Sequence, residues 1–329
     1  MKHANVSIFI PDAGCPHRCS FCNQKTISGA MHMPTLREID EALQTAIQSG
    51  ADPKTTEIAF FGGSFTCIDR TQMKTLLQHA MAYVKTGHFS GIRISTRPDG
   101  IDEEVLSCLQ SYGVTAIELG CQSMDDRVLR LNERGHTAAD TVRACRLIHD
   151  FGFSLGVQMM TGLPGDLDET AMETTRRLLA LRPDTARIYP TVVLKGTRLA
   201  DWYRAGLYRA QTVEEAVALC SRLLLLFEEN GVRVIRLGLH SGGNVEDGFL
   251  AGPYHPAFRE LCDNRIYLER SKELLRSLPV GDYTLCVGTA FLSQAVGQQK
   301  RNLLQLENAG YRVRFCTVDT LKRYELTLI

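Results

Sequence analysis

No stretch of the 329-residue chain approaches the roughly 18 consecutive apolar residues that a membrane-spanning helix requires. The first five residues lead straight into an apolar run and lack the pattern of a secretion signal. Net charge is also missing, because 37 basic and 37 acidic side chains balance. No overall field therefore attracts nucleic acid or an anionic membrane. We expect a cytoplasmic protein without membrane attachment. The balanced net charge does not exclude a local basic patch on its surface.

Internal repeats, low-complexity tracts and Ser/Gly-rich linkers are likewise missing, and 44% hydrophobic residues are ordinary for a globular protein. The length suits one large α/β domain, or one domain with a smaller appendage. The cysteine count of 11 is odd. Together with the missing signal, it argues for a reducing compartment and against a disulfide framework.

From residue 6 onward, short β-type runs alternate with longer helical patterns. The predicted strands are Val6–Ile10, Glu57–Phe61, Gly91–Ser95, Ala116–Gly120, Leu155–Met160 and Thr185–Tyr189. The predicted helices lie near Leu36–Gln48, Thr71–Tyr83, Asp102–Tyr112, Thr137–Phe151 and Asp168–Leu181. Such alternation implies a parallel sheet with right-handed crossovers. We predict an α/β fold with a partial (β/α)6 TIM-type barrel, and a doubly wound open sheet is the alternative.

The remainder of the chain changes character. A long apolar-striped helix begins near residue 211 and ends near Gly231. The predicted elements that follow are strand Arg233–Leu237, a Gly-rich loop, helix 257–276, strand Tyr283–Val287, helix Leu292–Asn308 and strand Tyr311–Thr317. We therefore predict a core barrel at residues 1–198 and a smaller C-terminal α/β extension at residues 199–329, packed on the core.

Three cysteines, Cys15, Cys19 and Cys22, fall in a C-x3-C-x2-C pattern just after the first predicted strand. A strand followed by such a loop brings three thiolates to one edge of the sheet. Iron–sulfur clusters are usually held by four thiolates, so three would leave one iron open to another ligand. The alternative is structural zinc, which C-x2-C also suits. Its fourth ligand would come from His17, His32 or Cys67.

Polar and glycine residues recur where successive predicted strands end. In a barrel of this type, functional residues gather at the carboxyl ends of the strands. The residues concerned are Gly62, Gly63 and Ser64 after the second strand, Ser95 after the third, Gln122 after the fourth, Gln158 on the fifth and Tyr189 on the sixth. Glu118, in a buried-looking strand, needs a partner, and we expect that partner to be Arg187 or Arg134.

The cysteine spacing resembles that of the radical S-adenosylmethionine (SAM) enzymes. This resemblance implies a [4Fe–4S] cluster held by Cys15, Cys19 and Cys22, with SAM bound to the open iron. It also implies reductive cleavage of SAM and abstraction of a hydrogen atom from a substrate, chemistry that the cofactor supplies while the protein orients the reactants. An electron donor such as flavodoxin or ferredoxin would then be a partner.

The resemblance also assigns a SAM site to this sequence. Phe21 matches the position near the adenine, and Arg134 matches an arginine that can clamp the SAM carboxylate. The other positions that match are Gly62, Gly63 and Ser64 for the ammonium and Ser95, Gln122 and Gln158 for the ribose. The alternative for Gly62-Gly63 is a tight strand-to-helix turn. Tyr189 is expected as a pocket wall or a hydrogen-atom relay, with a core aromatic as the alternative.

The segment Arg187–Thr197, with Trp202 and Tyr208, is similar to the region after the barrel in Elongator catalytic subunits, which act on wobble uridines of tRNA. Glu133–Thr137 is similar too. The cysteine spacing is shared instead with oxygen-independent coproporphyrinogen oxidases, and the chain ends before an acetyltransferase domain could fit. We expect an Elongator-like enzyme acting on a tRNA base. The alternatives are a radical SAM enzyme for a small metabolite or porphyrin, and a non-enzymatic zinc-bound RNA-binding module.

Overall fold

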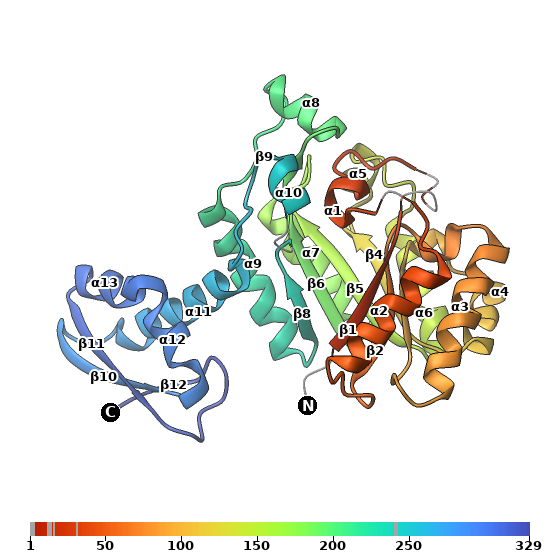
Figure 1. Ribbon diagram of the computed structural model, residues 1–329. Coiled ribbons are helices and arrows are strands. Elements are labelled where there is room, and N and C mark those ends of the chain that lie inside the picture. The colour runs from red at the N-terminus through yellow and green to blue at the C-terminus, as the bar shows by residue number, and fades with distance from the viewer. Residues whose placement is uncertain (1–3, 12–14, 16, 31, 240–242) are drawn as a thin grey trace.

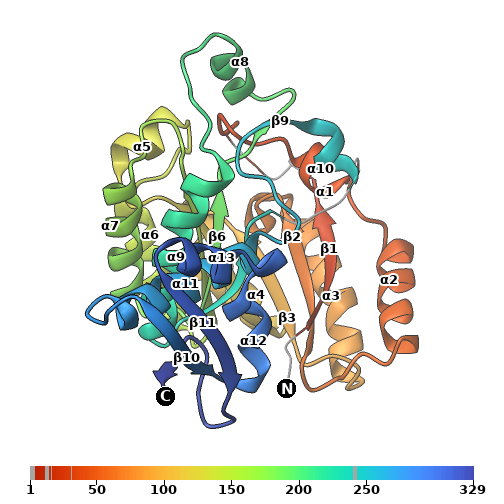
Figure 2. The same cartoon turned by 90° about the vertical axis from the view of Figure 1, so that its left-hand side faces the viewer.

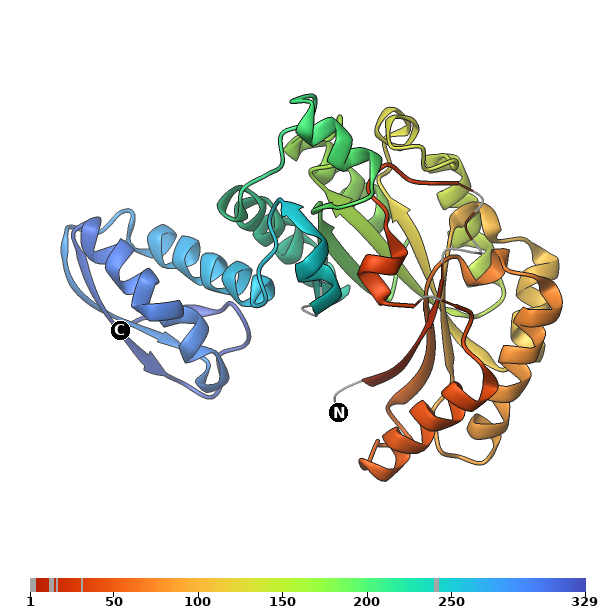
Figure 3. The ribbon, with the colours of Figure 1, turned by 45° about the horizontal axis from the view of Figure 1, so that its top comes forward.

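The computed structural model describes residues 4–329 except 12–14, 16, 31 and 240–242. Its main feature is a seven-stranded sheet in the order β1-β2-β3-β4-β5-β6-β8, in which all neighbouring strands run parallel. The strands are β1 (Ala4–Ile10), β2 (Thr56–Gly62), β3 (Ile92–Thr96), β4 (Val114–Gln122), β5 (Ser154–Thr161), β6 (Thr185–Pro190) and β8 (Arg233–Leu237). The sheet is curled, with helices along its outer side (Figures 1 and 3).

The outer helices bury the sheet's convex face. They are α2 (Leu36–Gln48), α3 (Arg70–Lys85), α4 (Glu103–Ser111), α6 (Ala138–Asp150), α7 (Asp168–Leu179) and α9 (Val213–Glu229). Three of them begin with reciprocal capping boxes, at Thr35, Thr137 and Thr212, which satisfy otherwise unpaired amides of the first turn. The interior strand β3 is buried along its whole length, as expected for a parallel strand covered on both faces.

Short elements gather at the carboxyl ends of the strands, above the sheet in Figure 1. They are α1 (Gln24–Ser28), α5 (Asp126–Leu131), α8 (Arg198–Arg204), α10 (Gly243–Gly248) and the antiparallel pair β7 (Val193–Leu194) and β9 (Phe249–Ala251). Among the described helices, none is long and apolar enough to cross a membrane.

The partial barrel is confirmed, but it has one strand more than expected. The segment Arg233–Leu237 was predicted as a strand of the extension. It is β8, which pairs in parallel with β6 and continues the main sheet. The helix before it, α9, is the crossover that parallel pairing requires. The division between residues 198 and 199 stays a proposal. The last unit of the main sheet, α9 and β8, lies on the C-terminal side of that division.

A smaller α/β lobe follows, beside the barrel in Figures 1 and 3 and in front of it in Figure 2. Its sheet has the order β11-β10-β12. Its elements are α11 (Phe258–Leu275), β10 (Gly281–Val287), α12 (Leu292–Val296), α13 (Arg301–Asn308), β11 (Tyr311–Thr317) and β12 (Leu326–Leu328). Helix α11 joins the lobe to the barrel, because Ser221 Oγ of α9 donates to the carbonyl of Cys262, 3.2 Å away.

The single helix expected over Leu292–Asn308 is wrong. It is split into α12 and α13, because Gly297, Gln299 and Lys300 have φ values of 77°, 52° and 62°. Neighbouring residues with left-handed backbone angles, such as Gln299 and Lys300, cannot continue a right-handed helix. The apolar spacing of this segment suits two short helices on the same face as well as it suits one long helix.

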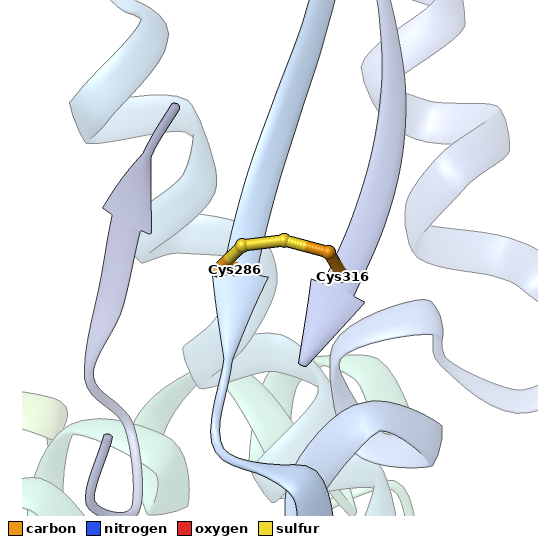
Figure 4. Close-up of a disulfide and its surroundings, with 2 residues drawn as sticks. All are labelled: Cys286 and Cys316. Atoms are coloured by element: carbon orange, nitrogen blue, oxygen red, sulfur yellow. A yellow bond between two sulfur atoms is a disulfide. The ribbon is translucent and has the colours of Figure 1, made fainter. Parts of the chain in front are cut away.

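A disulfide joins the two parallel strands of the lobe, between Cys286 and Cys316 (Figure 4). The two residues are directly paired in the register of β10 and β11, with Cα atoms 4.5 Å apart. The other nine cysteines are free. The cysteine argument from the sequence left no place for a disulfide and so missed this one.

Replacing both cysteines with alanine should loosen the lobe selectively. The bond spans a sequence separation of 30 residues, and closing a loop of that size restricts the unfolded chain by about 3–4 kcal/mol. Hydrogen exchange of β10 and β11 peptides measures the loss. Reductant should lower their protection in the natural chain and leave the Cys286→Ala/Cys316→Ala variant unchanged. Equal protection in all samples would contradict this expectation.

Candidate functional site

The cysteine loop lies between β1 and α1, at the carboxyl end of β1. Its middle residue, Ser20, anchors it on two sides. The Ser20 amide and hydroxyl both donate to Asn132, at 3.1 and 2.7 Å, and the Ser20 carbonyl accepts from the Leu199 amide at 2.8 Å. The loop is therefore tied at Ser20 to the end of α5 and the start of α8, which fixes the position of the chain between Cys19 and Cys22.

Next to this loop is a cavity of about 440 Å³. It brings together all the residues predicted to hold a cluster or SAM: Cys15, Cys19, Cys22, Phe21, Gly62, Gly63, Ser64, Ser95, Gln122, Arg134 and Gln158. Tyr189 does not line it. Other lining residues were not predicted to hold a cluster or SAM, namely His17, Arg18, Gln24, Thr96 and Gly120. Two of these could have been predicted from their position in the sequence. Gln24 follows the last cysteine of the motif by two residues, and Thr96 directly follows Ser95.

Each cysteine sulfur has a polar neighbour. Arg134 Nη1 donates to Cys19 Sγ at 3.4 Å, Gln24 Nε2 donates to Cys22 Sγ at 3.5 Å, and Ser64 Oγ lies 3.6 Å from Cys15 Sγ. Hydrogen bonds of this kind to cluster sulfurs help to set a reduction potential.

Burial raises the pKa of the Cys22 thiol to about 12, and the nearby Cys19 and Cys15 add to the rise. Burial opposes the charge of Arg134, but those sulfurs raise the pKa of its guanidinium. Because the two neighbouring sulfurs raise the pKa of Cys22 more than Arg134 lowers it, a further positive charge would favour the thiolate forms, and the iron ions of a cluster supply such charge. The donor set therefore fits an iron–sulfur cluster.

Among the described residues, no group of three or more His, Cys, Asp or Glu side chains lies close enough together to hold a metal ion as it stands. Of the three candidates for a fourth zinc ligand, His17 lines the cavity. His32 instead contacts the carbonyl of Met33 at 2.9 Å. The Cys67 sulfur lies 4.0 Å from the hydroxyl of Thr66.

Gly62 is required by the packing of β2 against β1. Its φ is 104°, and a Cβ there would lie 2.3 Å from the carbonyl oxygen of Ile10. The following amide, of Gly63, donates to that same oxygen at 2.8 Å. The glycine pair therefore makes the tight turn considered as the alternative, and it also places backbone groups at the cavity.

Arg134 is held both through its side chain and through its own carbonyl. Its Nη2 donates to the Gly120 carbonyl at 2.7 Å, and its own carbonyl accepts from Arg97. Arg97 is fully buried and paired with Asp99 at 2.9 Å, so its charge is already neutralised. The buried Nε of Arg134 has no partner in the described part of the chain.

Gln122 lies at a kink at the end of β4. The pairing of β4 with β5 shifts register between Gly120 and Gln122, and Gln122 has a φ of 64°. A Cβ at Gly120 would lie 2.7 Å from Arg134 Nη2 and 2.9 Å from Gln122 Nε2. The irregularity turns the strand end toward the cavity, as bulges near active sites often do.

Behind the cavity lies a buried polar network centred on Glu118. Its carboxylate pairs with Arg187 at 2.6 Å and with Arg93 at 3.5 Å, and it accepts from Gln158 at 2.8 Å. Gln158 also donates to Ser95 at 3.2 Å. The expected Glu118–Arg187 pair is confirmed, and two predicted SAM residues are positioned by the same carboxylate.

A second cavity of about 400 Å³ adjoins the first. Tyr189 lines this one, with its hydroxyl 3.5 Å from Arg187 Nη1. The guanidinium of Arg187 lies 4.7 Å from the centre of the Phe61 ring. Tyr189 is therefore a wall residue, and its role as a relay stays a prediction.

Gly62→Ala should destabilise the protein far more than Gly87→Ala. Both glycines have positive φ, but a Cβ at Gly87 meets nothing within 4 Å. The control therefore carries only the backbone cost of about 1–2 kcal/mol, whereas Gly62→Ala adds overpacking of about 1–3 kcal/mol against β1. Urea unfolding measures both, and equal losses would show that the contact with Ile10 does not matter.

Glu118→Gln should cost about 3–5 kcal/mol, because it leaves the buried charge of Arg187 without its partner. The matched control is Glu41→Gln. Glu41 pairs with Arg37 at 2.8 Å on the exposed face of α2, where such pairs contribute little. Chemical unfolding of the two variants provides the comparison, and a small effect at Glu118 would mean that water replaces the carboxylate.

Comparisons with known proteins agree with this geometry. The model of the radical SAM superfamily matches residues 9–178, a span that includes the three cysteines and all the predicted SAM residues. The model of the radical SAM C-terminal domain matches residues 183–268. This second match begins just before β6 and extends into α11.

Several curated proteins are similar in sequence. An uncharacterised protein of Methanocaldococcus jannaschii is 30% identical over 64% of this chain and 63% of its own length. The tRNA uridine(34) acetyltransferase of Methanocaldococcus infernus is 27% identical over 66% and 48%. Elongator complex protein 3 of Homo sapiens is 36% identical over 41% and 25%. The chain thus spans less than two thirds of the length of these relatives.

Two solved structures are similar in fold. The archaeal Methanocaldococcus infernus Elp3 has a TM-score of 0.66 at 20% identity, covering 82% of this chain and 63% of that one. Coproporphyrinogen III oxidase (HemN) from Escherichia coli has a TM-score of 0.50 at 19% identity, covering 69% and 52%. At these identities the likeness establishes the fold alone, and it agrees with the predicted partial barrel.

Proposed function

The chain belongs to the radical SAM superfamily, and we propose that it is an Elongator-like member that acts on a tRNA base. It is an enzyme of the class that uses a [4Fe–4S] cluster and SAM, which removes the zinc-bound RNA-binding module from consideration. When bound, these cofactors supply reductive cleavage of SAM and abstraction of a hydrogen atom from the substrate. The protein contributes binding, orientation and the exclusion of water.

The roles proposed for the residues follow from their positions around the first cavity. Cys15, Cys19 and Cys22 would hold the cluster, and Arg134 would donate to the Cys19 sulfur, as it does in the structure. Such outer contacts orient the ligands and tune the metal. Arg134 uses two of its five N–H groups for these contacts, so in this proposal the remaining ones, the unpartnered Nε–H among them, are left for the SAM carboxylate.

The remaining SAM contacts come from several strand ends. The residues proposed are Phe21 for the adenine, Gly62, Gly63 and Ser64 for the ammonium, and Ser95, Gln122 and Gln158 for the ribose. Backbone carbonyls and neutral side chains are suitable partners for ammonium and hydroxyl groups. Tyr189, across the second cavity, is proposed as a wall residue that could also pass on a hydrogen atom.

The tRNA assignment is supported by the names of relatives, a tRNA uridine(34) acetyltransferase and an Elongator complex protein. Their matches to this chain lie in the radical SAM region and span at most about half of those proteins, so transfer of their substrate is part of the proposal. A cytoplasmic location and an electron donor such as flavodoxin or ferredoxin are also part of it. A small metabolite or porphyrin is the second candidate, favoured by the cysteine spacing.

The observation that carries the enzymatic proposal is the gathering of all three cysteines and all eight predicted SAM residues around one cavity. Replacing the three cysteines with serine should abolish both the absorbance near 400 nm, typical of iron–thiolate clusters, and SAM cleavage. Cys108→Ser is the control, because Cys108 is a free cysteine of α4 and should leave both unchanged. SAM cleavage by the triple variant would remove these residues from the mechanism.

The tRNA substrate is tested separately, by mass spectrometry of nucleosides from the tRNA of a strain that lacks this gene. We expect one modified uridine to disappear and to return when the gene is restored. Restoration with the triple serine variant is the control and should fail. An unchanged nucleoside profile, with SAM cleavage intact, would direct the search to the small-molecule alternative.

A further inference from the structure

The two cavities at the barrel mouth share part of their walls. The shared residues are Phe21, Cys22, Gln24, Gly62, Ser95, Gln122 and Gln158. A molecule in the second cavity would therefore face a cofactor bound in the first, without an intervening layer of protein. Its volume of about 400 Å³ lies within the range of small-molecule sites.

The walls that belong only to the second cavity are largely apolar and aromatic. They include Phe9, Phe61, Ile27, Met160, Val192 and Leu194. The Phe61 ring is backed by the guanidinium of Arg187, which fixes its orientation. Flat apolar walls of this kind suit a planar ring or another weakly hydrated body.

The charged side chains that line the second cavity are all basic. Two arginines line it, and the described lining residues include no Asp or Glu. Arg187 is neutralised from behind by the buried Glu118. Arg236, its partner in the register of β6 and β8, is exposed and has neither a hydrogen bond nor an ion pair with any described residue. One uncompensated cation therefore stands at the wall formed by β8.

We propose that the second cavity binds the reacting part of the substrate and that Arg236 holds an anionic group on it, a phosphate or a carboxylate. Arginine suits this role, because its planar guanidinium donates two parallel hydrogen bonds to either oxyanion. The apolar walls take the uncharged body, and the shared wall presents that body to the cofactor cavity. This inference rests on the proposed radical SAM function, although not on the tRNA assignment.

The test is equilibrium binding to the anaerobically reconstituted enzyme with SAM, measured by calorimetry. Two matched pairs of probes separate the sources of the anion: uridine 5′-monophosphate against uridine, and orotate against uracil. We expect at least one anion to bind more tightly than its neutral counterpart. Arg236→Gln should remove that advantage, a loss of about tenfold to a hundredfold for a hydrogen bond to a charged group. Arg236→Lys should keep part of it.

The control is Arg314→Gln, because Arg314 on β11 is also exposed and without a described partner but lies in the C-terminal lobe. It should leave all four affinities unchanged. Loss of the advantage for uridine 5′-monophosphate points to a phosphate, and loss for orotate points to a carboxylate, and either supports the proposal. The proposal is overturned if neither anion is preferred, or if Arg236→Gln leaves the preference intact. SAM cleavage, assayed on the same samples, reports separately on the proposed function.

Discussion

A single buried carboxylate joins four neighbouring strands inside the barrel. Glu118 on β4 pairs with Arg93 on β3 and Arg187 on β6, and it accepts from Gln158 on β5. A charge buried to this degree is tolerated only when it is paired and hydrogen-bonded. The strands must therefore keep the register that lets all three partners reach it. Both cavities at the mouth depend on this register, because Gln158 lines both and Arg187 lines the second.

Because of this network, the two cavities differ in which arginine is available to a ligand. On one side, Arg134 donates to the Cys19 sulfur and to the Gly120 carbonyl. On the other, the charge of Arg187 is used by Glu118 before any substrate arrives. The first cavity thus offers its positive charge to sulfur and the second offers Arg236 to solvent. Two ligands of different charge can occupy adjacent space without competing for the same arginine.

Much of this arrangement is readable from the sequence, for physical reasons. Apolar runs of strand length alternate with amphipathic helices, so α2 was located to the residue and β6 to within one residue. The residues of the first cavity follow strand ends, and parallel strands bring their ends to one edge. Long-range pairing is harder to read. Nothing local in Arg233–Leu237 says which sheet it joins, and nothing in Cys286 or Cys316 says that β10 and β11 place them side by side.

Arg236 shows why the substrate side is the harder half to predict. The cofactor residues lie on β1 to β5 and the loops that follow them, where a fixed cofactor imposes a recognisable pattern. The second cavity is completed by β6 and β8, and its character comes from a balance of charges rather than a motif. An arginine matters there because Glu118 neutralises its neighbour and no described carboxylate neutralises it. Such a residue is recognised only when the contacts of every charged group around it are known.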